Sequence, residues 1–269
     1  MSADPSVITT LDEEGLASLR RWFLGYCRSF YTSREEDNRN IRLKEEHTEQ
    51  VCAFMELLTL ELGLDPGERR LAEAVALLHD VGRFEQYRCY GTFRDSDSEN
   101  HGTLGVRVLT RQGVLDGLAP EERRMILGTV ALHNAFRIPD AIDGPARRLL
   151  HLVRDADKLD IWRVFLEFYG LPPERQASAV GLGFPDLPVC TPRVVATVMR
   201  GELVNLATLR TLNDFKLLQL SWVFDLNFAV SRRLVVERRY VEQMAATLPL
   251  GEDVARVVAF VREYLARSG

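Results

Sequence analysis

The sequence has 269 residues, of which 46% are hydrophobic and 27% charged, a composition typical of a soluble globular protein. Its net charge of −5 provides no basic field for a nucleic-acid backbone, and it has no run of about 18 apolar residues that would span a membrane. The four cysteines show no CxxC spacing, and residues 1–6 lack the pattern of a signal peptide. We therefore expect reduced thiols, no membrane partner and a cytoplasmic location.

Helical spacing of apolar residues dominates the first part of the chain. Asp65 and Pro66 supply an N-cap and a first helical residue at the start of one of these helices. Aromatic residues mixed with Gly, Ser and Asp predict an ordered loop over 84–99. The next helix is expected to start near Ser98, with His101 in its first turn. The other elements predicted here are a helix over 11–31, a loop over 31–40, and helices over 42–62 and 66–80.

The second part of the chain continues the helical pattern, and no alternating strand pattern occurs in it. The fold class that follows is all-α. The predicted elements are helices over 120–134, 145–169, 192–200, 214–247 with a break, and 251–267, and a long loop over 170–190 that is rich in Pro and Gly. The predicted division is an N-terminal helix and loop (1–40), a helical core (41–170) and a C-terminal helical extension of the same globular unit (171–269).

An apolar run over 74–78 leads directly into His79 and Asp80, and Gly82 and Arg83 follow. The run predicts that this helix end is buried, where an ionised Asp is costly unless it is paired or bound to a metal. Two interpretations remain open for the pair taken alone. It is either a hydrogen-bonded pair at a helix end or part of a metal site.

The positions of the other histidines favour the metal site. The chain has five histidines, and four of them fall where predicted helices begin, end or turn an apolar face inward. Two carboxylates follow on a later helix. Side chains that come from different helices can build a site in the core of a bundle, and imidazoles with carboxylates suit Fe, Mn, Ni, Co or Zn. The candidate ligands are His47, His79, Asp80, His101, His133 and one of the two carboxylates Asp155 and Asp157.

This ordered set resembles the HD-domain superfamily of metal-dependent phosphohydrolases, over roughly residues 40–165. The family pattern is a His, a His-Asp pair and a late Asp on a core of about five helices, matched here by His47, His79–Asp80 and an Asp within 154–158. The family's late Asp commonly follows Ala and precedes a basic residue, which favours Asp157 over Asp155. The resemblance implies an HD-type helical bundle.

Two further histidines, His101 and His133, match the subset of HD proteins that holds two metal ions. The resemblance implies that His47, His79, Asp80 and Asp157 hold one divalent transition-metal ion. A second ion would be held by His101, His133 and a bridging Asp80. Two such ions can generate a hydroxide and clamp a phosphoryl group.

The implied activity is phosphomonoesterase or phosphodiesterase action on a small substrate such as a nucleotide, by attack of a metal-bound hydroxide. Asp80, Arg83 and Lys158 are the predicted catalytic residues. Arg83, Lys158 and Arg137 are the predicted substrate-binding residues, since a guanidinium or ammonium group can hold phosphate. Each of these cations has an alternative reading, either as a partner of a helix dipole or as a member of a surface ion pair.

Two other functions stay open. The same ligand set resembles that of the di-iron HD oxygenases, which catalyse a different class of reaction. A metal-stabilised regulatory domain without catalysis is the third interpretation. The expected partner is a small phosphorylated molecule rather than a nucleic-acid polymer, and a homo-oligomer is left open.

Overall fold

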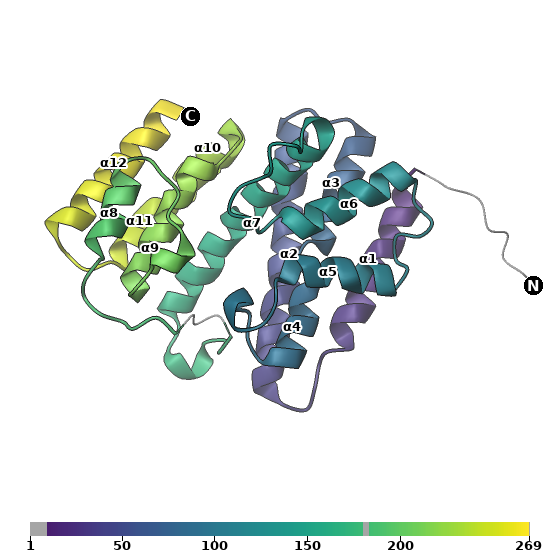
Figure 1. Ribbon diagram of the computed structural model, residues 1–269, viewed down its shortest axis with the longest axis horizontal. Coiled ribbons are helices and arrows are strands. Elements are labelled where there is room, and N and C mark those ends of the chain that lie inside the picture. Colours follow the sequence, from purple (N-terminus) through teal and green to yellow (C-terminus); the bar gives the residue numbers. More distant parts are fainter. Residues whose placement is uncertain (1–9, 180–182, 269) are drawn as a thin grey trace, which may run out of the picture. The chain divides into compact units, whose positions relative to one another are not determined.

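The computed structural model describes residues 10–179 and 183–268 (Figure 1). The segment 1–6, on which the prediction about a signal peptide rests, lies outside these residues. The chain divides into two compact units, each described here by itself. The first contains the described residues up to Ala156 with those of 177–180, and the second contains 157–176 and the described residues beyond 180. The boundary falls inside one long helix, α7 (Gly144–Gly170); the predicted segments 1–40, 41–170 and 171–269 stay predictions.

The first unit is built around α3, which packs against α1, α2 and α6, while α5 packs between α4 and α6 (Figure 1). Every residue from Ala74 to Leu78 at the end of α3 is buried, as the apolar run predicts. The helices of this unit are α1 (Glu13–Arg28), α2 (Glu35–Glu61), α3 (Pro66–Leu78), α4 (Gly82–Tyr90), α5 (His101–Arg111) and α6 (Pro120–Leu132), followed by the first part of α7.

The start of α3 follows its sequence signals. The Asp65 carboxylate accepts a hydrogen bond from the backbone N–H of Glu68, and the Glu68 side chain accepts one from the backbone of Asp65. This capping box satisfies N–H groups that have no partner inside a helix, and Pro66 needs none. At its other end α3 stops at Leu78, so His79 and Asp80 lie in the short turn that joins α3 to α4.

Two predicted loops are partly wrong. The segment 31–40 was predicted to be a loop, but α2 already begins at Glu35, because acidic residues in a first turn are stabilised by the helix dipole. The segment 84–90 also lies in a helix, α4, whose buried face includes Phe84. This helix ends at Gly91, which adopts a φ of 65° that favours glycine. Only the residues after Gly91 form the predicted loop.

Two glycines set the spacing of α4, α5 and α6. A Cβ on Gly82 would lie 2.1 Å from the carbonyl oxygen of His101, and one on Gly102 would lie 2.7 Å from that of Val130. No side chain fits at either distance, so glycine is what permits these helices to approach each other. The approach at Gly82 brings the first residue of α5 next to the turn that carries Asp80.

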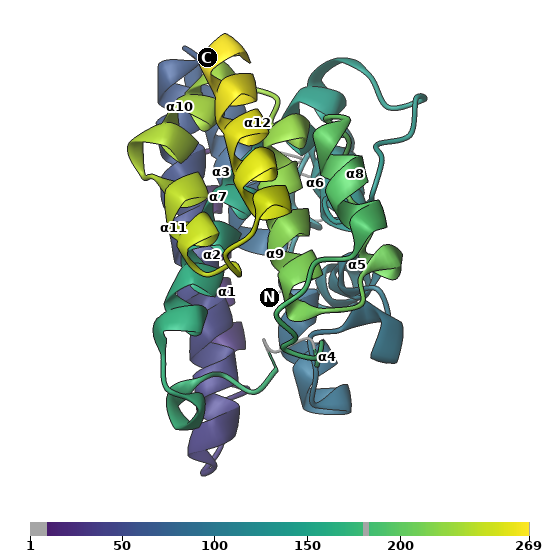
Figure 2. The same cartoon turned by 90° about the vertical axis from the view of Figure 1, so that its left-hand side faces the viewer.

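The second unit contains the rest of α7 and the C-terminal helices. Within it α8, α9, α11 and α12 pack against one another (Figure 2). Trp162 is buried, with its ring 5.8 Å from that of Tyr240 and 5.7 Å from that of Trp222. Residues 180–182 of the predicted loop over 170–190 lie outside the described residues. The remaining helices are α8 (Pro192–Met199), α9 (Leu212–Ser221), α10 (Ala229–Glu237), α11 (Tyr240–Ala246) and α12 (Glu252–Ser268).

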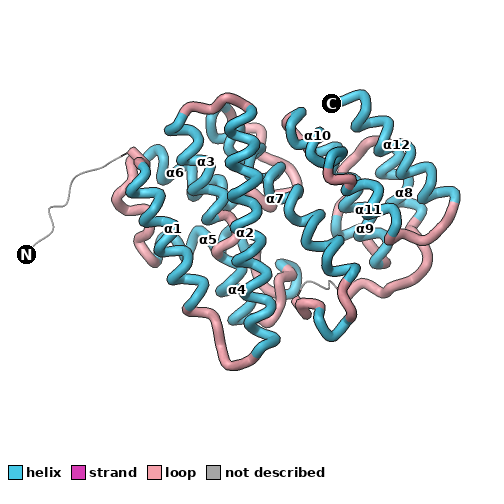
Figure 3. Tube along the Cα trace, turned by 180° about the vertical axis from the view of Figure 1, so that it is seen from behind, coloured by secondary structure: helices cyan, strands magenta, loops and turns pink. Residues whose placement is uncertain are grey.

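Figure 3 shows helices joined by loops throughout the described part of the chain, and no strand occurs in it. The prediction of an all-α fold is therefore confirmed. Among the described helices, none combines the length and the apolar character that crossing a bilayer requires.

Candidate metal centre

Asp80 is the centre of a buried cluster in the first unit, and only 3% of its surface is exposed. Its Oδ2 lies 3.7 Å from Nε2 of His47 and 3.9 Å from Nε2 of His79. Its Oδ1 lies 3.3 Å from Nε2 of His101 and 3.7 Å from Nε2 of His133. Each carboxylate oxygen therefore faces a different pair of imidazoles.

The four histidines come from different places in the helical framework. His47 lies on the buried face of α2, and His79 precedes Asp80 in the turn after α3. His101 is the first residue of α5, and His133 caps the C-terminus of α6. The donor atoms offered by His47, His79 and Asp80 lie within 4.8 Å of one another, and so do those offered by Asp80, His101 and His133.

Hydrogen bonds on the far side of three rings orient them toward the cluster. Nδ1 of His79 lies 2.7 Å from the carbonyl oxygen of Ala76, and Nδ1 of His133 lies 2.8 Å from that of Val130. A carbonyl oxygen can only accept, so Nδ1 carries the proton and Nε2 presents a lone pair. Nδ1 of His101 lies 2.8 Å from a carboxylate oxygen of Asp95, which has the same effect.

The orientation of these rings shows that the residues suit a metal ion. Nε2 of His101 and Nε2 of His133 are 3.0 Å apart, and the acceptors on Nδ1 leave a lone pair on each of them. Two facing lone pairs repel unless a cation lies between them or beside them. A set of imidazole nitrogens and carboxylate oxygens is also the donor set that divalent transition metals prefer. The cluster therefore fits metal ions on both sides of Asp80.

The protonation states of Asp80 and His101 also suit metal binding. Burial alone would raise the pKa of Asp80, but Lys44, His79 and Arg83 hold that pKa well below its usual range. Burial, together with the charge of Arg83, lowers the pKa of His101 to about 3. A carboxylate that is ionised and an imidazole that is neutral at ordinary pH are the forms that bind metals.

Asp95, in the loop before α5, connects several residues around the site. It accepts hydrogen bonds from Arg83 (3.1 Å), Gln86 (2.9 Å) and Asn134 (3.1 Å), in addition to its contact with His101. Burial would raise the pKa of Asp95, but the hydrogen bond from His101 and the neighbouring charges lower it to about 2. Nothing in the sequence singled out Asp95, which falls within the loop predicted over 84–99.

The predicted sixth ligand comes from α7. Asp155 is completely buried, whereas Asp157 is half-buried. The assignment of Asp157, with Asp155 as the alternative, as the last ligand stays a prediction.

The predicted substrate-binding cations have different surroundings. Arg83 donates hydrogen bonds to the carbonyl oxygen of Phe93 and to Asp95, and its Nε lies 3.5 Å from Oδ1 of Asp80. Nζ of Lys158 lies 2.8 Å from Oδ2 of Asp225 within the second unit. Arg137 is exposed in the segment after α6. Arg83 thus links the His-Asp turn to the loop that carries Asp95, and the phosphate-binding roles of these three cations stay predictions.

Two further basic residues at the site were missed from the sequence. Nζ of Lys44, on α2, lies 2.8 Å from Oδ2 of Asp80. Lys44 precedes His47 by three residues, so helical spacing could have placed it on the same face. Arg154, on α7, donates hydrogen bonds to the carbonyl oxygens of His133 and Ala135, and so holds the end of α6 in place.

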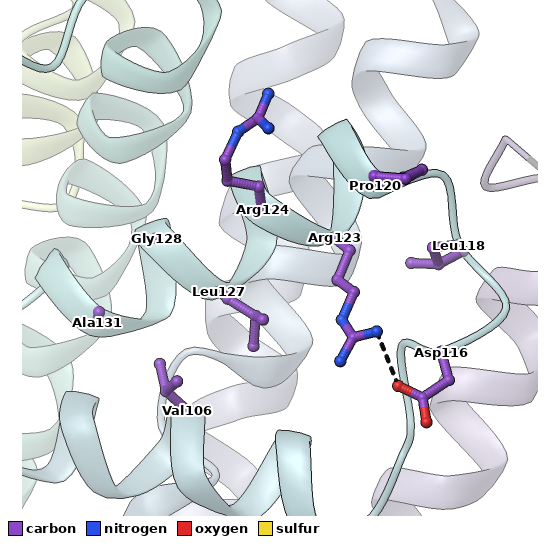
Figure 4. Close-up of a pocket in the computed structure, with 9 residues that line it drawn as sticks. All are labelled: Val106, Asp116, Leu118, Pro120, Arg123, Arg124, Leu127, Gly128 and Ala131. Carbon is purple, nitrogen blue, oxygen red and sulfur yellow. Dashed lines mark ion pairs between the residues drawn. The ribbon is translucent and has the colours of Figure 1, made fainter.

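A separate groove of about 570 Å³ lies beside α5 and α6 in the first unit (Figure 4). In it Arg123 points toward Asp116, with 3.0 Å between Nη1 and Oδ1, while Arg124 points away from this pair. None of the metal-ligand candidates lines it. The lining residues are Val106, Asp116, Leu118, Pro120, Arg123, Arg124, Leu127, Gly128 and Ala131.

Comparison with protein families agrees with the geometry of the cluster. The HD domain model matches residues 45–162, a range that contains every candidate metal ligand. This chain contains an HD domain. HD domains belong to a superfamily of metal-dependent hydrolase type, and the similarity covers this matched segment. Neither the curated proteins nor the solved structures gave a match.

Proposed function

We propose that the HD domain is a metal-dependent phosphohydrolase that acts on a small phosphorylated molecule such as a nucleotide. The observation that carries the proposal is the position of Asp80, which directs one oxygen toward His47 and His79 and the other toward His101 and His133. A carboxylate placed in this way can bridge two ions. Two-metal sites are a common means of phosphoester hydrolysis.

The proposed ligand assignment divides the cluster into two sides. His47, His79 and Oδ2 of Asp80 would hold one ion, with Asp157, or Asp155 in its place, as a further ligand. His101, His133 and Oδ1 would hold the other. Bound divalent ions of Fe, Mn, Ni, Co or Zn would lower the pKa of a water molecule and neutralise charge on the phosphoryl oxygens.

The protein's own residues would supply orientation and charge. Asp95 fixes the ring of His101, and Arg154 fixes the end of α6 beside His133. Arg83 and Lys44 place positive charge within 3.5 Å and 2.8 Å of the Asp80 carboxylate, which suits a substrate that brings negative charge to this point. Lys158 and Arg137 are proposed as further contacts of the substrate.

The proposed substrate is small because the net charge of −5 gives no extended basic surface for a polymer. We propose a cytoplasmic location, which agrees with the four free cysteines, and a homo-oligomer as one possible assembly.

The direct test is turnover of phosphomonoesters, phosphodiesters and nucleotides by protein whose metal content has been measured. Loading with Mn²⁺, Ni²⁺, Co²⁺ or Fe²⁺ is expected to give hydrolysis with at least one substrate class. Asp80→Asn is expected to abolish it, because both ions lose a ligand. Asp116→Asn, in the groove beside α6, is the matched control and is expected to leave the rate unchanged.

Two results would contradict the proposal. The first is the lack of phosphate release from the whole panel by protein that is shown to be metal-loaded. The second is oxygen consumption together with the EPR signal of a mixed-valent di-iron centre, which would assign the same ligand set to an oxygenase. If cells require the protein but grow normally with a folded Asp80→Ala variant, the regulatory interpretation would be favoured instead.

A further inference from the structure

Lys44 holds a position that the proposed ligand set does not use. Its ammonium nitrogen lies 2.8 Å from Oδ2 of Asp80, the oxygen that faces His47 and His79. The side chain is only 15% exposed, and Nζ lies 5.3 Å from the centre of the Phe93 ring. Lys44 is therefore a largely buried cation at one particular oxygen of the central carboxylate.

A metal ion at this oxygen would compete with Lys44. An ion held by His47, His79 and Oδ2 has to share that oxygen with the ammonium group, so two positive charges lie within a few ångströms of each other. Repulsion between charges at such distances is large where water is excluded. An ion on this side can therefore bind Oδ2 fully only if Lys44 gives up its contact with that oxygen.

The other side of Asp80 differs in how its nearby cation is balanced. Nε of Arg83 lies 3.5 Å from Oδ1, but the same guanidinium lies 3.1 Å from the carboxylate of Asp95. Asp95 also contacts His101 and so adds negative charge on that side. The charge of Arg83 is thus shared between the carboxylates of Asp80 and Asp95. Lys44, in contrast, directs its charge at Oδ2 of Asp80.

We propose that Lys44 is a competing counter-ion for Oδ2 of Asp80, which weakens binding of the metal ion on the His47–His79 side. The two ions then bind with unequal affinity, and a form with one ion is populated when metal is limiting. The flexible four-carbon stem allows the ammonium group of Lys44 to move away from Oδ2, and the ring of Phe93, whose centre lies 5.3 Å from Nζ, offers it a neighbouring π face. The inference rests on the metal site of the proposed function and not on the reaction.

The test measures Mn²⁺ binding to the full chain by titration calorimetry, after metal has been removed with a chelator and the chelator dialysed away. The wild-type protein is expected to show a tight and a weak site. Lys44→Met, which keeps the stem and removes the charge, is expected to tighten the weak site about tenfold and leave the tight site unchanged. Lys44→Gln, which retains a donor to Oδ2, is expected to give a shift in the same direction and serves if Lys44→Met does not fold.

Two control variants isolate the charge and its position. Lys44→Arg keeps the charge and is expected to keep the weak site weak. Arg42→Met removes the same charge from the same helix at an exposed position, where the side chain pairs with Glu35. This variant is expected to bind Mn²⁺ with wild-type affinity at both sites.

A second measurement separates competition from a simple structural ion pair. With chelator present, Lys44→Met is expected to melt below the wild type, because Asp80 loses a cation partner in a buried site. In saturating Mn²⁺ this difference is expected to shrink or reverse. An equal loss of Tm with and without Mn²⁺ would instead show that Lys44 is only structural, and would overturn the inference.

The remaining outcomes distinguish this inference from the function on which it rests. Equal Mn²⁺ affinities in the wild type and Lys44→Met would overturn the inference alone, whether or not KM for a substrate changes. A wild-type protein that binds no Mn²⁺, Ni²⁺, Co²⁺, Zn²⁺ or Fe²⁺ would overturn both.

Discussion

Three histidines of this cluster are oriented through Nδ1, the ring nitrogen that faces away from the cluster. His79 and His133 are fixed by backbone carbonyl groups of their own helices, whereas His101 is fixed by the carboxylate of Asp95. A carboxylate makes the ring a stronger donor than a carbonyl does, because the developing positive charge is partly balanced. Among these three candidate ligands, His101 is thus the one that is oriented by a side chain rather than by the backbone.

Replacement of this carboxylate should weaken one metal ion. Asp95→Asn is expected to lower the affinity of the ion on the His101–His133 side by about 10- to 100-fold, because the amide cannot balance charge on the ring. Competition with a chromophoric chelator measures the affinity. Asp97→Asn, whose side chain pairs with Arg94 at the surface, is the control and is expected to bind as the wild type does. Equal affinity in Asp95→Asn and the wild type would refute the orienting role.

The sequence singled out the residues proposed to bind metal and missed the residues that position them. His47, His79, His101 and His133 could be found because each is a rare residue at a helix boundary or on an apolar face. Asp95 lies in a run with Ser96 and Asp97, and nothing in the run shows which acid reaches His101. That choice is made by the approach of the loop to α5, which depends on contacts far apart in the chain.

The helices could be predicted where a local signal marks their ends. The Asp65–Pro66 start of α3 and the start of α6 at Pro120 follow from capping rules, and both were found. The N-terminal turn of α2 was missed because it is polar, so hydrophobic periodicity does not detect it. In α4 the aromatic residues pack on several sides, which blurs the helical period. Phe84 contacts the ring of Phe23 on α1 and that of Phe30, which follows this helix.

Helix packing at Gly82 can be tested by adding a single methyl group. Gly82→Ala is expected to lower the free energy of unfolding by about 3 kcal/mol, because its Cβ would meet the backbone of His101 and Gly105 at 2.1 Å and 2.6 Å. Urea denaturation measures this change. The displacement of α5 should also weaken Mn²⁺ binding at His101.

Gly128→Ala is the matched control, since Gly128 lies inside α6 with no atom within 4 Å of an added Cβ. It is expected to raise the free energy of unfolding by up to about 1 kcal/mol, because Ala is the better helix former. A Gly82→Ala protein as stable as the wild type would show that the contact between α4 and α5 is not as close as described.

At the scale of the whole molecule, the fold and the metal site depend on each other. The cluster places an ionised carboxylate and four imidazoles in the interior, at a cost in solvation that only hydrogen bonds and cations can offset. The HD domain could be predicted because the candidate ligands follow one another in an ordered pattern, and the all-α class because apolar residues recur at helical spacing. The substrate and the sixth ligand could not, since both depend on distances that no spacing along the chain fixes.

Removal of metal should therefore lower the stability of the protein. Ions that bind the folded chain and not the unfolded chain stabilise it by about 2.7 kcal/mol at a concentration 100 times their Kd. For a chain of this length, that corresponds to a rise in Tm of about 5–10 °C. Differential scanning calorimetry with Mn²⁺ and with EDTA is expected to show this difference for the wild type. Asp80→Asn should melt at nearly the same temperature under both conditions, because neither ion keeps its shared ligand. If Mn²⁺ raised the Tm of this variant as much as that of the wild type, the stabilising ions would bind elsewhere in the chain.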